Sequence, residues 1–464
     1  MRGRTIQAAL TPLGSAPTLQ RDRRASVGAR PCAPRGELPT TPKSAATHFR
    51  EREEPMRKRT LKATAMLAVA TLVTAACGAL GPAGGGGGAG GTIKVVSSLP
   101  MTGPSLAQTQ TIINAIKMAF EEVNYKVGNF TIEFEALDDA TPAAQSWEAA
   151  KEAENARAAA ADSKVVVYIG TYNSGAAAIS IPILCQAGLA MISPANTYPG
   201  LTKAGKGEAG EPDKYYPGGC KRNYSRVVPA DDLQGAVGAK WMKELGGKKV
   251  YILHDTQLYG KGLADVFRAT AKEIGLEEAA YEGAPKADNF RALANKVAAS
   301  GADFVYYSGL TDQNGGFLLR DLKEAKSSLK FMSVDGVAES QFIEQAGAAA
   351  EGAYITFGGV PSSAYEGKSK DWADSFTKKY PGNKAEVYTI YGYEAAKVVI
   401  AALQKAGDKA NDRATVRDAI MGTKDFEGVL GQKWSFTPEG DTTITTMAGM
   451  QITNKDFKLL KLLK

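Results

Sequence analysis

The side chains that could do chemistry in this 464-residue chain are hydroxyls, carboxylates and aromatic rings, because histidine is almost absent. The sequence contains only His48 and His254. A histidine-rich metal site, or a Ser-His-Asp or Cys-His nucleophile, is therefore hard to assemble. The sequence also has no phosphate-binding loop, zinc-ligand spacing or EF-hand loop. These observations favour ligand recognition over catalysis, and they predict no cofactor and no metal.

Polar residues gather in two loops of the first half of the chain, each directly after an apolar run. Tyr172, Asn173 and Ser174 follow the run 164–170, and Ser174 stands where a helix N-cap is expected. A helix N-terminus offers free N–H groups and a partial positive charge, which suit a carboxylate. The loop 193–198 supplies a hydroxyl and carbonyls that could receive an ammonium group. A plain N-cap without a ligand is the alternative interpretation of Ser174.

Two loops of the second half add an aromatic ring and a carboxylate. Tyr259 follows the apolar run 249–255 and could cover a ligand from the opposite side, or it could be a packing residue. Asp335 follows the run 330–334 and could pair with an ammonium group, or it could be a solvated turn residue. If these four loops face one another, their hydroxyls and carboxylate hold both ends of a zwitterion.

The elements that must position these loops alternate between strand and helix. We expect two runs of this alternation, separated by a polar break at 199–226, and therefore two α/β lobes with parallel sheets. In such sheets ligands bind beyond the carboxyl ends of the strands. The first run predicts strands at 92–97, 130–137, 164–170 and 190–193, with helices at 147–161 and 176–187. The second predicts strands at 249–255, 304–308 and 330–334, with helices at 263–274 and 317–326.

The positive charge of the chain is confined to its first 76 residues. The formal net charge is +7, and residues 1–55 carry +5 while residues 56–76 carry +4, so the remainder carries −2. The remainder has no electrostatic reason to bind nucleic acid. With 44% hydrophobic and 23% charged residues, the composition is that of a globular protein.

An export signal explains the basic excess. Residues 56–76 have a basic start, a short apolar run and small residues before Cys77, which is typical of a signal peptide. Residues 1–55 are interpreted as a disordered or untranslated extension. The small residues before Cys77 resemble a bacterial lipoprotein cleavage box, which implies lipidation of Cys77; ordinary cleavage near Ala76 is the alternative. Residues 77–91 are predicted to form a Gly-rich tether.

Two further cysteines flank the polar break. In an exported protein Cys185 and Cys220 are expected to form a disulfide, with two unpaired thiols as the alternative.

The order and spacing of several motifs resemble those of the periplasmic Leu/Ile/Val-binding protein family, the solute receptors of branched-chain amino acid ABC importers. The resemblance covers essentially all of 92–464. Its motifs are MTGP at 101–104, YIG at 168–170 with Ser174, ISPANT at 192–197, HD with YGKG at 254–262, DFVYY at 303–307 and DGVA at 335–338.

The resemblance implies two interleaved Rossmann-like lobes joined by three hinge crossovers around one ligand cleft. We place the hinges near 226–228, 356–358 and 436–438. The first lobe then comprises 92–226 with 358–436, and the second lobe comprises 227–357 with 437–464.

The resemblance also implies roles for individual residues. Ser174 and Thr197 would hold a ligand carboxylate, the Ala195 carbonyl and Asp335 would receive an ammonium group, and Tyr259 would close over the ligand. Tyr172 and Asn173 complete the first loop of the predicted site. Glu386 stands where the family often has an apolar aromatic residue, which would suit a polar or cationic ligand. A shift of register by two residues would place Tyr388 there instead.

These features together predict an exported, lipid-anchored, monomeric receptor at the outer face of the cytoplasmic membrane or in the periplasm. It would capture an amino acid, branched-chain or polar, by lobe closure and deliver it to the permease of an ABC importer. A ligand sensor for a membrane kinase or chemoreceptor is the first alternative. An α/β hydrolase is the second alternative, and the lack of a nucleophile-base motif disfavours it.

Overall fold

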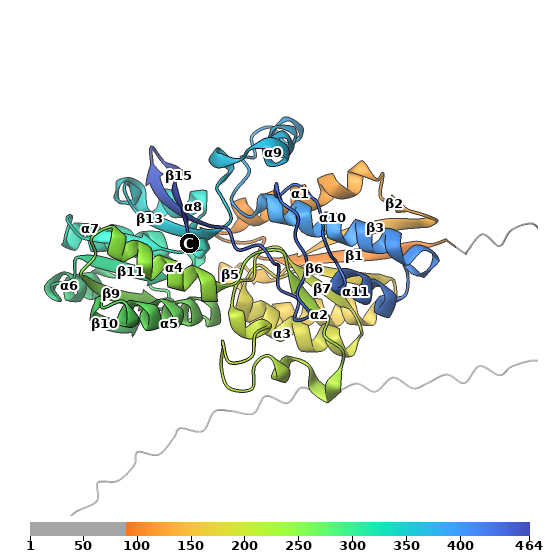
Figure 1. Cartoon of the computed structure of the whole chain (residues 1–464), viewed down its shortest axis with the longest axis horizontal. Helices are drawn as coiled ribbons and strands as arrows, with labels where there is room; N and C mark the ends of the chain where they lie inside the picture. The colour runs from red at the N-terminus through yellow and green to blue at the C-terminus, as the bar shows by residue number, and fades with distance from the viewer. Residues whose placement is uncertain (1–89) are drawn as a thin grey trace, which may run out of the picture. The chain divides into compact units, whose positions relative to one another are not determined.

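The computed structural model describes residues 90–464. The predicted extension, signal peptide and Cys77 lipidation site, and the tether up to residue 89, lie outside the described residues. Two sheets organise the described part of the chain, one formed mainly by its first half and one by its second half (Figure 1). Among residues 90–464, no helix is both long and apolar enough to span a membrane.

The first sheet has the strand order β2-β3-β1-β6-β7-β8, with parallel pairing between all neighbours except β2 and β3. Its strands are β1 (Thr92–Leu99), β2 (Lys126–Val127), β3 (Phe130–Asp138), β6 (Val165–Gly170), β7 (Ala190–Ser193) and β8 (Tyr224–Arg226). A small hairpin lies beside it, formed by β4 (Ala140–Thr141) and β5 (Ser146–Trp147). The helices packed on this sheet are α1 (Leu106–Glu122), α2 (Ala149–Ala161), α3 (Ser174–Gln186), α10 (Thr389–Ala406) and α11 (Arg413–Met421).

The second sheet has the order β10-β9-β11-β12-β13-β14-β15, parallel up to β13 and antiparallel beyond it. Its strands are β9 (Lys249–His254), β10 (Glu277–Gly283), β11 (Phe304–Ser308), β12 (Lys330–Ser333), β13 (Tyr354–Gly358), β14 (Met447–Thr453) and β15 (Asp456–Leu463). Its helices are α4 (Asp231–Glu244), α5 (Leu258–Glu273), α6 (Arg291–Ala299), α7 (Gly315–Ala325) and α8 (Ser340–Ala346), whereas α9 (Gly367–Lys379) packs through Trp372 on Tyr393 of α10.

Both sheets are buried on two faces, because successive side chains of a strand point in opposite directions. In β1, Ile93 and Val95 join the core beneath α1 and α10, whereas Val96 joins the core beneath α2 and α3. In β11, Phe304 and Val305 likewise belong to cores on opposite faces of the second sheet. This architecture confirms the predicted α/β class with two lobes. We call each sheet with its packed helices the first and the second lobe.

The chain passes between the lobes three times: after β8, after β13 and before β14. The predicted hinge at 436–438 lies within the segment 422–446, which leads from α11 to β14. In this segment Gly440 O accepts a hydrogen bond of 3.0 Å from the N–H of Arg226, the last residue of β8. The fully buried Arg226 side chain also pairs with Asp441, with 2.7 Å between Arg226 Nε and Asp441 Oδ1. The first and third passages are therefore joined by a buried ion pair.

Several predicted element bounds differ from those observed. The helix expected at 147–161 begins at Ala149, because Trp147 pairs with Ala140 in the small hairpin. The helix expected at 176–187 begins at Ser174, so Asn173 and not Ser174 occupies the N-cap. The antiparallel strands β2, β14 and β15 were not predicted. β14 and β15 pair beside β13 at one edge of the second sheet, and a short turn rather than a helix connects them.

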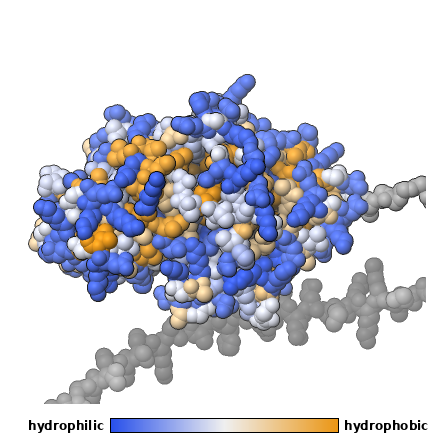
Figure 2. All heavy atoms as spheres, viewed as in Figure 1, coloured by the Kyte–Doolittle hydropathy of each residue, from blue (hydrophilic) through white to orange (hydrophobic). Residues whose placement is uncertain are grey.

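The polar break after β7 is a folded excursion held by a disulfide. Cys185 and Cys220 are joined, with their Cα atoms 5.9 Å apart, as predicted. Inside the excursion the Glu211 carboxylate accepts hydrogen bonds from Tyr198 and Tyr215 and pairs with Lys214. On the face drawn in Figure 2, hydrophilic residues are widespread and apolar residues gather over the second lobe. The exposed large hydrophobic residues of the described chain are Leu106, Leu460 and Leu462.

Replacing both cysteines, Cys185→Ala with Cys220→Ala, should lower the free energy of unfolding by about 3–4 kcal/mol, because the bridge restricts a loop of this length in the unfolded chain. Guanidinium unfolding of the double variant beside the parent measures this. An unchanged midpoint would mean that the Glu211 contacts hold the excursion without the bridge.

Candidate functional site

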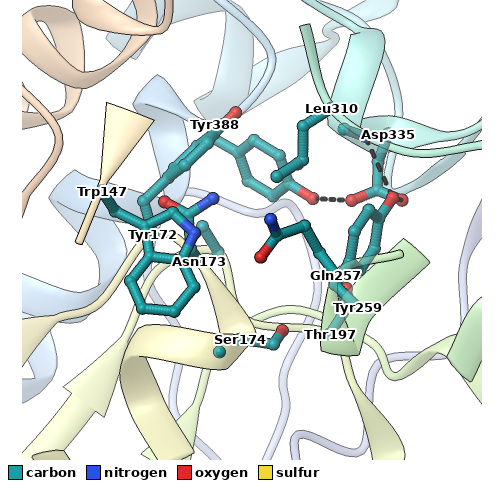
Figure 3. Close-up of a pocket in the computed structure, with 13 residues that line it drawn as sticks. Trp147, Tyr172, Asn173, Ser174, Thr197, Gln257, Tyr259, Leu310, Asp335 and Tyr388 are labelled. Atoms are coloured by element: carbon teal, nitrogen blue, oxygen red, sulfur yellow. Dashed lines mark hydrogen bonds between the residues drawn. The ribbon is translucent and has the colours of Figure 1, made fainter. Parts of the chain in front are cut away.

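A hollow lies between the lobes at the carboxyl ends of the two sheets (Figure 3). Its volume is about 360 Å³ when its open mouth is included. The lining residues are Trp147, Tyr172, Asn173, Ser174, Gly175, Ala195, Thr197, Gln257, Tyr259, Leu310, Asp335, Gly336 and Tyr388. Most of them come from loops that directly follow β6, β7, β9, β11 and β12, so the topology of both sheets converges on this one space.

One end of the hollow is suited to an anion. The first turn of α3 begins at Ser174, and the N–H groups of a first helical turn have no partners inside the helix. The neighbouring loop is held by Ser193, whose Oγ accepts hydrogen bonds from the N–H groups of Ala195 and Asn196 at 3.1 and 2.8 Å. This fixed loop presents Ala195 and Thr197 to the hollow beside the N-terminus of α3. A carboxylate is the natural occupant of this end.

The opposite end carries a buried acid without a counter-ion. Asp335 accepts a hydrogen bond of 2.6 Å from Gln234 Nε2. It also accepts hydrogen bonds from Tyr259 OH, at 2.7 Å, and from Tyr388 OH (Figure 3). The residues that line the hollow include no lysine, arginine or histidine. Burial raises the pKa of the Asp335 carboxyl, and the hydrogen bonds from Tyr388, Tyr259 and Gln234 act against that rise. A ligand ammonium group would supply the missing charge.

A second buried acid, Asp231, lies close to Asp335. Asp231 is fully buried at the start of α4, and no hydrogen bond within ordinary geometry reaches its carboxylate oxygens in the described chain. Burial and then the neighbouring Asp335 raise the pKa of the Asp231 carboxyl well above its usual value, while Thr197 and Arg226 act to lower it. A cation bound at Asp335 would lower the pKa of both carboxyl groups and so favour their charged forms.

Hydrogen bonds across the hollow already join the two lobes. Tyr388 of the first lobe donates to Asp335 of the second, and Tyr172 OH of the first donates to Glu339 Oε1 at 2.7 Å. Gln108 connects these two tyrosines, because its Nε2 donates to Tyr172 OH and its Oε1 accepts from Tyr388 N. The structure is therefore a closed arrangement in which polar contacts span the site.

The structure places seven of the eight predicted ligand residues around the hollow: Tyr172, Asn173, Ser174, Ala195, Thr197, Tyr259 and Asp335. Glu386 does not line it; the aromatic Tyr388, two residues later, occupies that place. Glu386 is half-buried, and its pKa is raised by burial, with Ser340 and Lys384 acting against the rise. The contact of these residues with a ligand stays a prediction.

Three side chains of the lining were missed by the sequence reasoning: Trp147, Gln257 and Leu310. Trp147 was assigned to a helix, but β5 brings its ring against α3, where a Cβ on Gly175 would come within 2.6 Å of the indole. Gly175 directly after Ser174 was the available signal, since a close approach there requires glycine. Leu310 and Gln257 carry no signal of their own beyond following β11 and β9.

His254 is buried in the second lobe, at the end of β9. Its Nδ1 accepts a hydrogen bond of 3.1 Å from Thr256 N, and its ring lies 5.2 Å from that of Tyr281. Burial lowers its pKa. It is not among the residues that line the hollow.

Two parallel-dominated α/β lobes with a polar hollow at their strand ends define a solute-binding fold of the type I periplasmic kind. A family model described as periplasmic binding protein matches residues 92–457. The chain therefore belongs to the periplasmic binding protein family, and its predicted resemblance to the Leu/Ile/Val-binding proteins is confirmed.

Individual relatives agree with this membership. The chain is 29% identical over 348 residues to a Leu/Ile/Val-binding protein of Rhizobium johnstonii, covering 74% of this chain and 87% of the relative. It is 30% identical over 359 residues to a Leu/Ile/Val-binding protein homolog of Brucella abortus, covering 76% and 88%.

Solved structures share the fold. The leucine-binding protein of Thermotoga maritima has a TM-score of 0.69 at 24% identity, covering 80% of this chain and 99% of that one. An isoleucine complex of a branched-chain amino acid transporter substrate-binding protein from Streptococcus pneumoniae has a TM-score of 0.68 at 24% identity, with the same coverage. A solute-binding protein of R. palustris in complex with benzoate also has a TM-score of 0.68, at 17% identity, covering 80% and 96%. One fold thus holds chemically different ligands.

Replacing Glu339 by Gln should weaken the pH dependence of stability. Burial raises the pKa of this carboxyl to about 8. A group whose pKa is raised on folding contributes stability that is present below its usual pKa and lost as pH rises through the raised value. Between about pH 5 and pH 9 the free energy of unfolding should therefore fall less in Glu339→Gln than in the parent. The difference should be on the order of a few kcal/mol.

Thermal unfolding across this pH range measures the effect. Glu244→Gln on the exposed end of α4 is the matched control and should follow the parent. Identical pH profiles for Glu339→Gln and the parent would contradict the raised pKa.

Proposed function

We propose that this protein is an extracytoplasmic receptor that binds an amino acid between its lobes and delivers it to the permease of an ABC importer. The observation that carries the proposal is the pairing of a helix N-terminus with an uncompensated buried carboxylate in one hollow. Together these groups complement the two charges of a zwitterion. The Leu/Ile/Val-binding relative of Rhizobium johnstonii and the isoleucine complex from Streptococcus pneumoniae support an amino acid as the ligand.

In this proposal Ser174 and Thr197 receive the carboxylate, Asp335 and the Ala195 carbonyl receive the ammonium group, and Tyr259 closes over the ligand. Ligand binding and closure are coupled, since the groups come from both lobes and only the closed form brings them together. The hydrogen bonds from Tyr172 to Glu339 and from Tyr388 to Asp335 stabilise that closed form. Lobes with the predicted bounds would move about the three passages.

Membership of the periplasmic binding protein family and the N-terminal sequence support an extracytoplasmic location. An exported monomer, held at the membrane by lipid on Cys77 through the Gly-rich tether, would present the closed receptor to the permease. Binding without turnover is the activity expected of it.

Isothermal titration of the intact protein against the twenty amino acids tests the proposal. At least one should bind, and Asp335→Asn should weaken that binding roughly tenfold to a hundredfold, because a charged hydrogen bond is lost from a buried site. Ser174→Ala should weaken it less, since the N–H groups of α3 remain. Glu244→Gln, which removes an exposed carboxylate at the last residue of α4 and outside the lining of the hollow, is the control.

Failure to bind any amino acid would overturn the proposal. Unchanged affinity in both Asp335→Asn and Ser174→Ala would show that the ligand binds elsewhere.

A further inference from the structure

Resting on this proposed function, we propose that the amino acid carries an uncharged polar side chain, a hydroxyl or a carboxamide, which Asn173 and Gln257 bind by hydrogen bonds. Asn173 belongs to the first lobe and Gln257 to the second. The two residues would then decide which amino acid the receptor selects.

Asn173 is buried in an unusual state. Its side chain lines the hollow and the residue is 4% exposed, yet neither Oδ1 nor Nδ2 has a hydrogen-bond partner in the described chain. An asparagine at an N-cap ordinarily accepts a hydrogen bond from its own helix, but this one makes no such bond. Buried amides without partners are rare because their desolvation is not repaid by any contact. Both atoms are therefore available to a ligand.

A neighbouring asparagine shows the ordinary behaviour. Asn196, also buried, donates through Nδ2 to Tyr172 O at 2.9 Å, and its Oδ1 accepts from Tyr224 OH at 3.2 Å. The local fold can thus satisfy a buried amide. That it satisfies Asn196 and leaves Asn173 facing the hollow points to a function for Asn173 beyond packing.

Gln257 brings a second amide from the other lobe. Its backbone is fixed, because its N–H donates to Asp255 Oδ1 at 2.9 Å. Its side chain is half-buried and reaches into the middle of the hollow toward the first lobe, on the side where Asn173 and Trp147 lie (Figure 3). Two amides from two lobes offer donors and acceptors together, which complements a group that itself both donates and accepts.

The other lining groups exclude a charged side chain. No lysine, arginine or histidine of this lining could neutralise an acidic side chain. The one lining carboxylate, Asp335, is assigned to the ligand ammonium group and leaves no second partner for a basic side chain. The hydroxyls of Tyr172 and Tyr388 are directed to Glu339 and Asp335. The groups left to face the ligand side chain are the aromatic rings of the lining, Leu310 and the amides of Asn173 and Gln257.

Two pairs of amino acids of equal shape test the inference: asparagine against leucine, and threonine against valine. In each pair only the polar group differs. The intact protein should bind asparagine or threonine at least about tenfold more tightly than its apolar partner, because the apolar ligand leaves the Asn173 amide unpaired. Titration calorimetry with all twenty amino acids places these four in order.

Asn173→Leu and Gln257→Met, which keep shape and remove the amide, should each reduce the preference within the pairs by about tenfold. Gln404→Met on the exposed last turn of α10 is the control and should leave the preference unchanged. Thermal unfolding verifies that Asn173→Leu is folded. If Asn173→Leu does not fold, Gln257→Met at its half-buried position carries the test alone.

The outcomes separate this inference from the proposed function. Tightest binding of an amino acid without a hydroxyl or amide overturns the inference and leaves the receptor function standing. Equal weakening of both members of a pair in the variants also overturns it, since the amides would then bind the ligand backbone. Absence of binding by all twenty overturns the proposed function itself.

Discussion

The site depends on the charge of Asp335, a carboxylate buried at the end of β12 with three hydrogen-bond donors and no cation in the lining around it. Hydrogen bonds from neutral donors lower the free energy of such a charge, but only a cation compensates it fully. Asp231 adds a second carboxyl close by. The ammonium group of a ligand would supply the cation that the lining of the hollow lacks.

The same requirement explains why the site is divided between two sheets. The carboxyl ends of the parallel strands of each lobe point toward the other lobe, so one lobe contributes the N-terminus of α3 and the other contributes Asp335. Neither lobe alone can hold both ends of a zwitterion. Two tyrosines donate hydrogen bonds between the lobes, Tyr172 to Glu339 and Tyr388 to Asp335. These hydrogen bonds stabilise the closed arrangement. The buried Arg226–Asp441 pair holds the end of β8 against the segment that leads to β14.

The sequence predicts those features that neighbouring residues determine, and it misses those that contacts between distant segments determine. The strands β7 and β11 were predicted with their observed bounds, because short apolar runs between polar loops need no distant partner to be recognised. Trp147 was misassigned, because the short hairpin that holds it is formed by pairing with Ala140 and its ring rests on Gly175 of another element. The exchange of Glu386 for Tyr388 has the same origin: the turn before α10 decides which residue faces the hollow, and no periodic pattern marks that turn.

The sequence by itself determined the α/β class, the two lobes, the confinement of the basic residues to the first 76 positions and the chemistry of the loops that carry Ser174, Tyr259 and Asp335. These follow from composition and from alternation along the chain, which are local properties. Only the tertiary structure decided that Asn173 is buried without partners, that Gln257 reaches the hollow from the opposite lobe, and that Asp335 meets no cation. Whether a polar group is satisfied depends on atoms brought near it from distant segments, and that is settled only when the lobes pack.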